Sequence, residues 1–104
     1  MPKISENPPG SAFAIHIEHP ARDWAEWKRA FDSDPASRAR GGVRGYRVSR
    51  AIDDPNYVVI DLDFDDQPRA EAFLGALQQL WARVVPSGLI TGPRGRVIQV
   101  VEAR

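Results

Sequence analysis

The segment from Tyr57 to Phe64, YVVIDLDF, restricts the fold of this chain more than any other feature of the sequence. Its side chains alternate between two faces. One face is wholly apolar and consists of Val58, Ile60, Leu62 and Phe64. The other face is mixed and consists of Tyr57, Val59, Asp61 and Asp63. A period of two predicts a β-strand that must be covered by other apolar surface on one face only.

Three other segments are predicted to be strands. Ala12–Glu18 (AFAIHIE) alternates in the same way, with His16 and Glu18 on the polar side, and His19-Pro20 is expected to end it. Residues 45–51 and 96–102 are the other two. The residues DDPN at 53–56 are typical of a turn, so strands 45–51 and 57–64 are expected to form a hairpin.

Two helices are expected to supply the missing apolar cover. The first begins at Asp23 in a capping-box pattern with Glu26, and it carries an aromatic stripe: Trp24, Trp27 and Phe31. Pro35 cannot continue it, and Asp34 is expected to cap a short turn at 35–40 that Gly41-Gly42 ends. Asp66 is expected to cap a second helix whose apolar spacing continues for about four turns to Val84.

This order predicts an α+β, ferredoxin-like β-α-β-β-α-β fold. The antiparallel sheet should have the strand order fourth, first, third, second, with both helices on one face. The other face has no helix to cover it, although it carries apolar residues beside its charges, so we expect a homodimer in which a second subunit covers it. Residues 1–11 are expected to be a flexible tail, and residues 12–104 a single domain.

The amino-acid composition argues against several classes of function. Lys plus Arg and Asp plus Glu number 14 each, which argues against a dedicated binder of nucleic acids or membrane surfaces. No cysteine is present, which excludes disulfides, thiolate catalysis and cysteine-ligated zinc. With two histidines we expect no metal site, although two histidines with carboxylates stay possible as ligands. No glycine-rich phosphate motif, signal peptide or 18-residue apolar run occurs, so we expect no nucleotide cofactor and a cytoplasmic protein.

Four segments carry a resemblance to known proteins: HPARDWAEWKRAFD at 19–32, RARG at 38–41, DDPNYVVIDLDF at 53–64 and AEAFLGALQQLW at 70–81. Together they resemble a group of small bacterial proteins of unassigned function. Their layout is similar to the dimeric α/β-barrel superfamily of antibiotic biosynthesis monooxygenases, muconolactone isomerase-like proteins and haem-degrading monooxygenases. The resemblance implies that two sheets close into a barrel whose uncovered faces line a cavity. Haem degraders carry a histidine on a helix; neither predicted helix has one, so no cofactor is expected.

The uncovered face supplies the predicted catalytic pair. His16 and Asp61 lie on neighbouring strands and face the same side, so they are expected to come within hydrogen-bond reach. They could serve as an acid/base unit, or form a structural hydrogen bond that satisfies both groups. Arg47 is expected to face them and to bind a ligand or pair with a carboxylate, but a one-residue slip of the hairpin would place Arg50 there instead.

Three more residues are candidates for ligand binding at the rim of this pocket. Tyr57 and Asn56 lie at the start of the third strand. His19 follows the end of the first strand, where it could reach the pocket mouth or serve in a turn.

The leading functional hypothesis is a cofactor-independent oxygenase, isomerase or cyclase that acts on a small, mostly apolar molecule. The alternative is a non-catalytic module that uses the same cavity to bind a small molecule or to stabilise the protein. An RNA-binding module of the same element order is a distant third, because carboxylates on the third strand repel phosphate.

Overall fold

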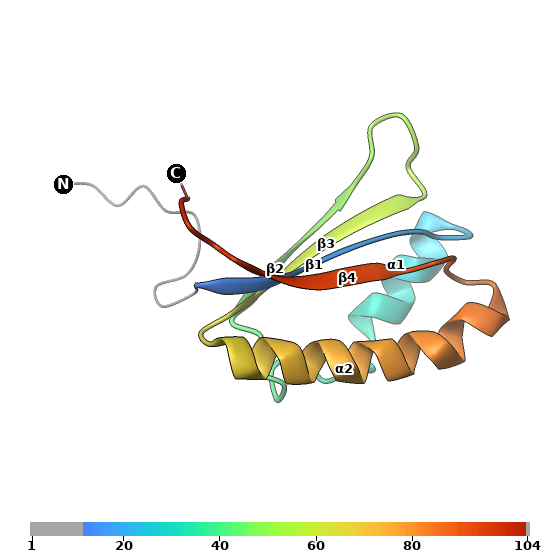
Figure 1. The fold of residues 1–104 in the computed structure, drawn as a ribbon. Helices are drawn as coiled ribbons and strands as arrows, with labels where there is room; N and C mark the ends of the chain where they lie inside the picture. The colour runs from blue at the N-terminus through green and yellow to red at the C-terminus, as the bar shows by residue number, and fades with distance from the viewer. Residues whose placement is uncertain (1–11, 104) are drawn as a thin grey trace.

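The computed structural model describes residues 12–103, and the predicted tail at 1–11 lies outside this range. Within it the element order is β1 (Phe13–Pro20), α1 (Trp24–Asp32), β2 (Gly45–Arg50), β3 (Tyr57–Phe64), α2 (Gln67–Val84), a 3₁₀ turn (Val85–Ser87) and β4 (Arg94–Gln99). The sheet has the order β2-β3-β1-β4 and is antiparallel throughout. Both helices lie on one side of it (Figure 1). The predicted ferredoxin-like fold is therefore confirmed.

The hydrophobic core lies between the sheet and the two helices. Every second residue of β1 and β3 faces it, and these side chains are almost fully buried: Ile15, Ile17, Val58, Ile60, Leu62 and Phe64. The helices contribute Trp27 from α1 and Ala70, Phe73 and Leu77 from α2. The aromatic stripe of α1 continues as a row of ring contacts, with Trp24 5.6 Å from Trp27 and Trp27 5.1 Å from Phe31 between ring centres.

Both helices begin at the predicted caps. The Asp23 carboxylate accepts the Glu26 N–H at 3.0 Å, and the Asp66 carboxylate accepts the Arg69 N–H at 2.9 Å. Each bond satisfies one of the amide groups that the first turn of a helix leaves without a partner. The Glu26 side chain does not bond back to the cap as a capping box predicts; it forms a bidentate pair with Arg22 at 2.7 and 3.0 Å.

Several predicted boundaries were wrong. β1 continues through His19 to Pro20, because β3 pairs with it along its whole length as far as Tyr57. A proline is tolerated at such a strand end. β4 is shifted to Arg94–Gln99, because it pairs with β1 from Glu18 back to Phe13. The short turn predicted at 35–40 is present, and the Asp34 carboxylate accepts the Arg38 N–H there at 2.9 Å.

Candidate functional site

The predicted site residues separate onto the two faces of the sheet. His16, Asp61, Arg47 and Tyr57 lie on the face without a helix, which we call the open face. His19 lies on the opposite, helix-covered face, and Asn56 lies in the turn before β3. The structure therefore brings together only part of the predicted set.

The predicted contact between His16 and Asp61 is confirmed. The His16 Nδ1 lies 2.7 Å from the Asp61 Oδ1. The other ring nitrogen, Nε2, lies 2.9 Å from a carboxylate oxygen of Glu18, and the Tyr57 hydroxyl donates to the second oxygen of Glu18 at 2.7 Å. Glu18 was not among the predicted site residues, although the alternation of β1 places it beside His16 and could have identified it.

This network favours the protonated form of His16. Hydrogen bonds to Asp61 and then to Glu18 raise the pKa of His16 above its ordinary value. Tyr57, and next His16, lower the pKa of Glu18. An imidazolium donates through both nitrogens, so it has no lone pair left to take a proton from a substrate. The stability that this network contributes is present below the ordinary pKa of histidine and is lost as pH rises through the raised value.

The hairpin register decides which arginine faces this network. In the register of β2 and β3, Arg47 lies opposite Asp61 on the open face, and Arg50 lies opposite Val58 on the other face. The Arg50 guanidinium lies 4.7 Å from the centre of the Trp24 ring of α1. Arg47 is therefore the open-face arginine of this strand.

Asn56 joins α1 to the start of β3. Its side-chain oxygen accepts the Trp24 N–H at 2.8 Å, and its backbone carbonyl accepts the Ala21 N–H at 2.7 Å. Its side-chain oxygen is thus engaged in the fold, at a helix terminus, and does not face the pocket rim for which it was predicted.

His19 was expected near the mouth of the open-face pocket, but it is 2% exposed beneath the helices. Because β1 continues past Glu18, His19 shares the inward face of Ile17. Its Nδ1 donates to the Pro20 carbonyl at 3.1 Å, so Nε2 carries the lone pair of the neutral ring. Its ring meets Trp27 edge to face at 5.6 Å, and burial lowers the pKa of His19. His19 is accordingly a neutral, desolvated imidazole at pH 7.

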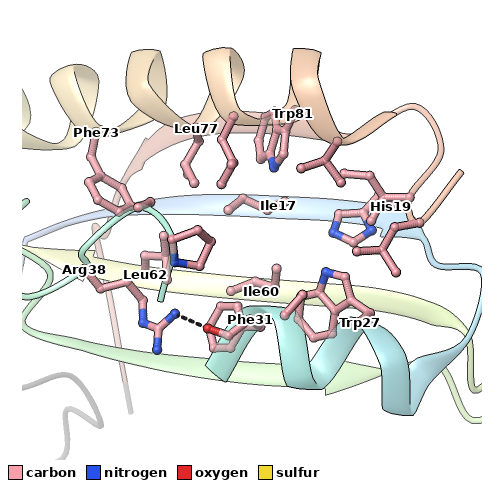
Figure 2. Close-up of a pocket in the computed structure, with 17 residues that line it drawn as sticks. Ile17, His19, Trp27, Phe31, Arg38, Ile60, Leu62, Phe73, Leu77 and Trp81 are labelled. Atoms are coloured by element: carbon pink, nitrogen blue, oxygen red, sulfur yellow. Dashed lines mark hydrogen bonds between the residues drawn. The ribbon is translucent and has the colours of Figure 1, made fainter. Parts of the chain in front are cut away.

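His19 lines a cavity of about 100 Å³ between the sheet and the helices, which we call the inner cavity (Figure 2). Its walls are apolar, with Ile17, Ile60 and Leu62 from the sheet, Trp27 and Phe31 from α1, and Leu77 and Trp81 from α2. Among the lining residues that the structure describes, only His19 and Arg38 have ionisable side chains. The sequence predicted the aromatic stripe of the first helix, but it gave no sign of a hollow between the sheet and the helices.

Arg38 lies at the other end of this lining from His19 (Figure 2). Its guanidinium is 4.0 Å from the centre of the Phe31 ring and 4.9 Å from that of Tyr46. It donates to the Phe31 carbonyl at 2.9 Å and lies 3.4 Å from the Asp34 carboxylate. These contacts hold the Arg38 guanidinium against two aromatic rings.

A second hollow runs along the β4 edge of the sheet, from the open face to α2. It is a wide polar groove of about 600 Å³ lined by His16, Glu18, Gln78, Arg94 and Arg96 with Pro93 and Gly95. Within residues 12–103 the His, Asp and Glu side chains form no group that could hold a metal ion, and no helix is long and apolar enough to cross a membrane.

The chain matches no known family model and no curated protein by sequence. Its fold matches solved structures closely. A mutant of SnoaB, a cofactor-independent oxygenase from Streptomyces nogalater, has a TM-score of 0.70 at 17% identity, and the match covers 89% of this chain and 96% of that one. A protein of unknown function from Nitrosomonas europaea has a TM-score of 0.69 at 17% identity, with coverages of 93% and 96%.

A third similar structure is a candidate antibiotic biosynthesis monooxygenase from Deinococcus radiodurans, with a TM-score of 0.64 at 19% identity and coverages of 88% and 95%. Two structures from uncultured marine organisms, with TM-scores of 0.62 and 0.63, are described as dimeric ferredoxin-like proteins. These likenesses show the fold and leave the reaction open. The chain has the fold of the antibiotic biosynthesis monooxygenase-like, dimeric ferredoxin-like proteins.

Proposed function

We propose that this protein binds a small, mostly apolar molecule in the inner cavity and acts on it without a cofactor, most simply as an oxygenase. The observation that carries this proposal is His19, a neutral imidazole in the lining of an apolar cavity, whose Nε2 carries the lone pair of the ring. A desolvated base in a cleft is the kind of group that removes a proton in catalysis. The likeness to an oxygenase that needs no cofactor supports the same reading.

The size of the cavity limits the substrate. A dry cavity of about 150 Å³ holds a benzene molecule, so a space of about 100 Å³ admits a group no larger than one ring unless side chains move. In this role, His19 accepts a proton from an acidic C–H or O–H group of the bound molecule. The aromatic walls hold the apolar body of that molecule and exclude water from the anion that forms.

The open-face pair is the second candidate site. The 2.7 Å contact between His16 and Asp61 favours an acid/base role for it, as the sequence predicted. In this role the imidazolium serves first as an acid, because both its nitrogens already donate. The adjoining groove, with Arg94 and Arg96, would then hold the ligand. A non-catalytic binding module would use the inner cavity without turnover.

Binding of small aromatic probes tests the site. Ala30 lines the inner cavity, so Ala30→Leu should fill it and weaken binding of phenol at least tenfold. The matched control on the same helix is Ala25→Leu, at an exposed position, which should leave binding unchanged. Titration calorimetry measures both.

Two histidine variants then distinguish binding from catalysis. His19→Asn should retain probe binding but lose oxygen uptake with any probe that wild type oxidises, whereas His16→Asn should retain both. Loss of binding in His16→Asn with retention in Ala30→Leu would move the site to the open face. Binding without uptake in wild type would favour the binding module.

We also infer that the protein is a homodimer that buries the open face. Val59 lies at the centre of this face and is half-buried in one chain. A stable dimer should bury about 1,600 Å² in total. Val59→Glu would place a charge in that interface and should make the protein monomeric at micromolar concentration, measured by sedimentation. Gln79→Glu, on the exposed side of α2, is the control. A wild-type monomer would disprove the dimer.

A further inference from the structure

The open face has a regular charge pattern. Strand register aligns Arg47 of β2, Asp61 of β3, His16 of β1 and Arg96 of β4 in one row across the sheet. In the next row of this face, Glu18 of β1 lies beside Arg94 of β4. The inner strands thus carry carboxylates, and the edge strands carry arginines.

This pattern is self-complementary. When two sheets pack face to face with their strands nearly at right angles, each edge strand of one copy crosses the inner strands of the other. Arginines of one copy can therefore meet carboxylates of the other. The net charge of zero leaves no overall repulsion between copies.

Two exposed apolar side chains favour the same partner. Ile52, in the turn between β2 and β3, is fully exposed, and Val101, just after β4, is 86% exposed. Both segments bend away from the helices, toward the side of the open face (Figure 1). A second copy that packs on this face would contact both segments. The structures described as dimeric ferredoxin-like proteins support this occupant.

We propose that formation of this dimer requires the protonated form of His16, so that the open face is a pH-dependent interface between two copies of this chain. This inference rests on the homodimer inferred above and is independent of the inner cavity. The stability of the dimer would then depend on the protonation of His16, whose ring lies between the carboxylates of Asp61 and Glu18.

The geometry gives the direction of the effect. Protonated His16 donates to Asp61 and Glu18 at once. A neutral ring has one N–H, so its lone pair would face a carboxylate at less than 3 Å. In the monomer Glu18, which is partly exposed, can turn to water. In a closed interface it cannot, and a buried carboxylate without a donor is costly. The dimer therefore binds the proton more tightly than the monomer does.

The other charged and titratable groups of the open face do not reverse the expectation that the dimer is tighter at low pH. They are Glu18, Tyr57, Asp61 and Asp63 on the inner strands and Arg47, Arg94 and Arg96 on the edge strands. Arginines stay charged at all relevant pH values. The hydrogen bond to Glu18 raises the pKa of Tyr57, and burial raises the pKa of Asp63, with Asp61 adding to the effect. His16 is the open-face group whose ordinary pKa of 6.5 lies between pH 6 and pH 9, and the raised pKa of Asp63 favours the dimer at the same, lower end of this range.

Sedimentation velocity of the full chain at pH 6, 7.5 and 9, at constant ionic strength, tests the proposal. The dimer dissociation constant of wild type should rise at least tenfold between pH 6 and pH 9. In Glu18→Gln the side-chain amide can donate to the His16 lone pair, so this variant should remain dimeric at pH 9. Gln79→Glu should follow wild type.

The outcomes are distinguishable. A wild-type dissociation constant that does not change with pH would overturn the proton dependence and leave the dimer standing. A monomer at every pH would disprove both the dimer and its proton dependence, and it would leave the proposal for the inner cavity unaffected. A Glu18→Gln dimer that weakens with pH as wild type does would show that His16 is not the responsible group.

Discussion

Phe73→Ala is expected to lower the free energy of unfolding by about 3–5 kcal/mol, the usual cost of removing a buried aromatic ring. Phe73 is 4% exposed, and its ring lies 5.7 Å from that of Phe64 across the core. It also lines the inner cavity, so its removal enlarges a space that is already there. Against a typical total of about 5–15 kcal/mol, this loss is a large part of the stability of the fold.

Urea unfolding followed by tryptophan fluorescence, at one fixed protein concentration, measures the loss from the midpoint and slope. The control is Asp23→Ala, which removes one N-cap hydrogen bond and should cost only about 1 kcal/mol. Equal losses in the two variants would mean that α2 does not carry Phe73 into the core.

Gly41→Ala is expected to have the second largest effect on stability, a loss of about 1–3 kcal/mol through overpacking. A methyl group at Gly41 would lie inside the contact distance of two ring carbons of Phe73, Cδ1 and Cε1. On its other side the Phe73 ring packs against Phe64 of β3, 5.7 Å between ring centres, so a shift of the ring would disturb that contact. The turn that contains Gly41 would have to shift instead.

Two comparisons isolate this cause in the same urea experiment. Gly75→Ala, in α2, has no atom within 4 Å of the added methyl and should gain about 0.5–1 kcal/mol from helix propensity. Gly41→Ala should also cost much less when Phe73 is already alanine, because the clashing ring is gone. An equal cost in both backgrounds would assign the effect to the backbone of the turn.

The local patterns of the sequence determined most of the architecture. Alternation over Tyr57–Phe64 identified the two faces of the central strand, because side chains of a strand point to opposite sides whatever their neighbours are. Both helix starts followed from Asp23 and Asp66, because a cap acts within one turn. The same alternation, on two strands that had to be adjacent, was sufficient to predict the contact between His16 and Asp61.

Tertiary structure alone decided the rest of the candidate site. The choice between Arg47 and Arg50 depended on the hairpin register, which a slip of one residue would reverse. His19 changed faces because β3 pairs with β1 as far as Pro20, beyond the point at which the proline was expected to end the strand. The inner cavity exists because two helices and a sheet leave space between side chains from distant parts of the chain. Periodicity identifies which residues face the core, but whether their volumes fill it depends on how the elements pack.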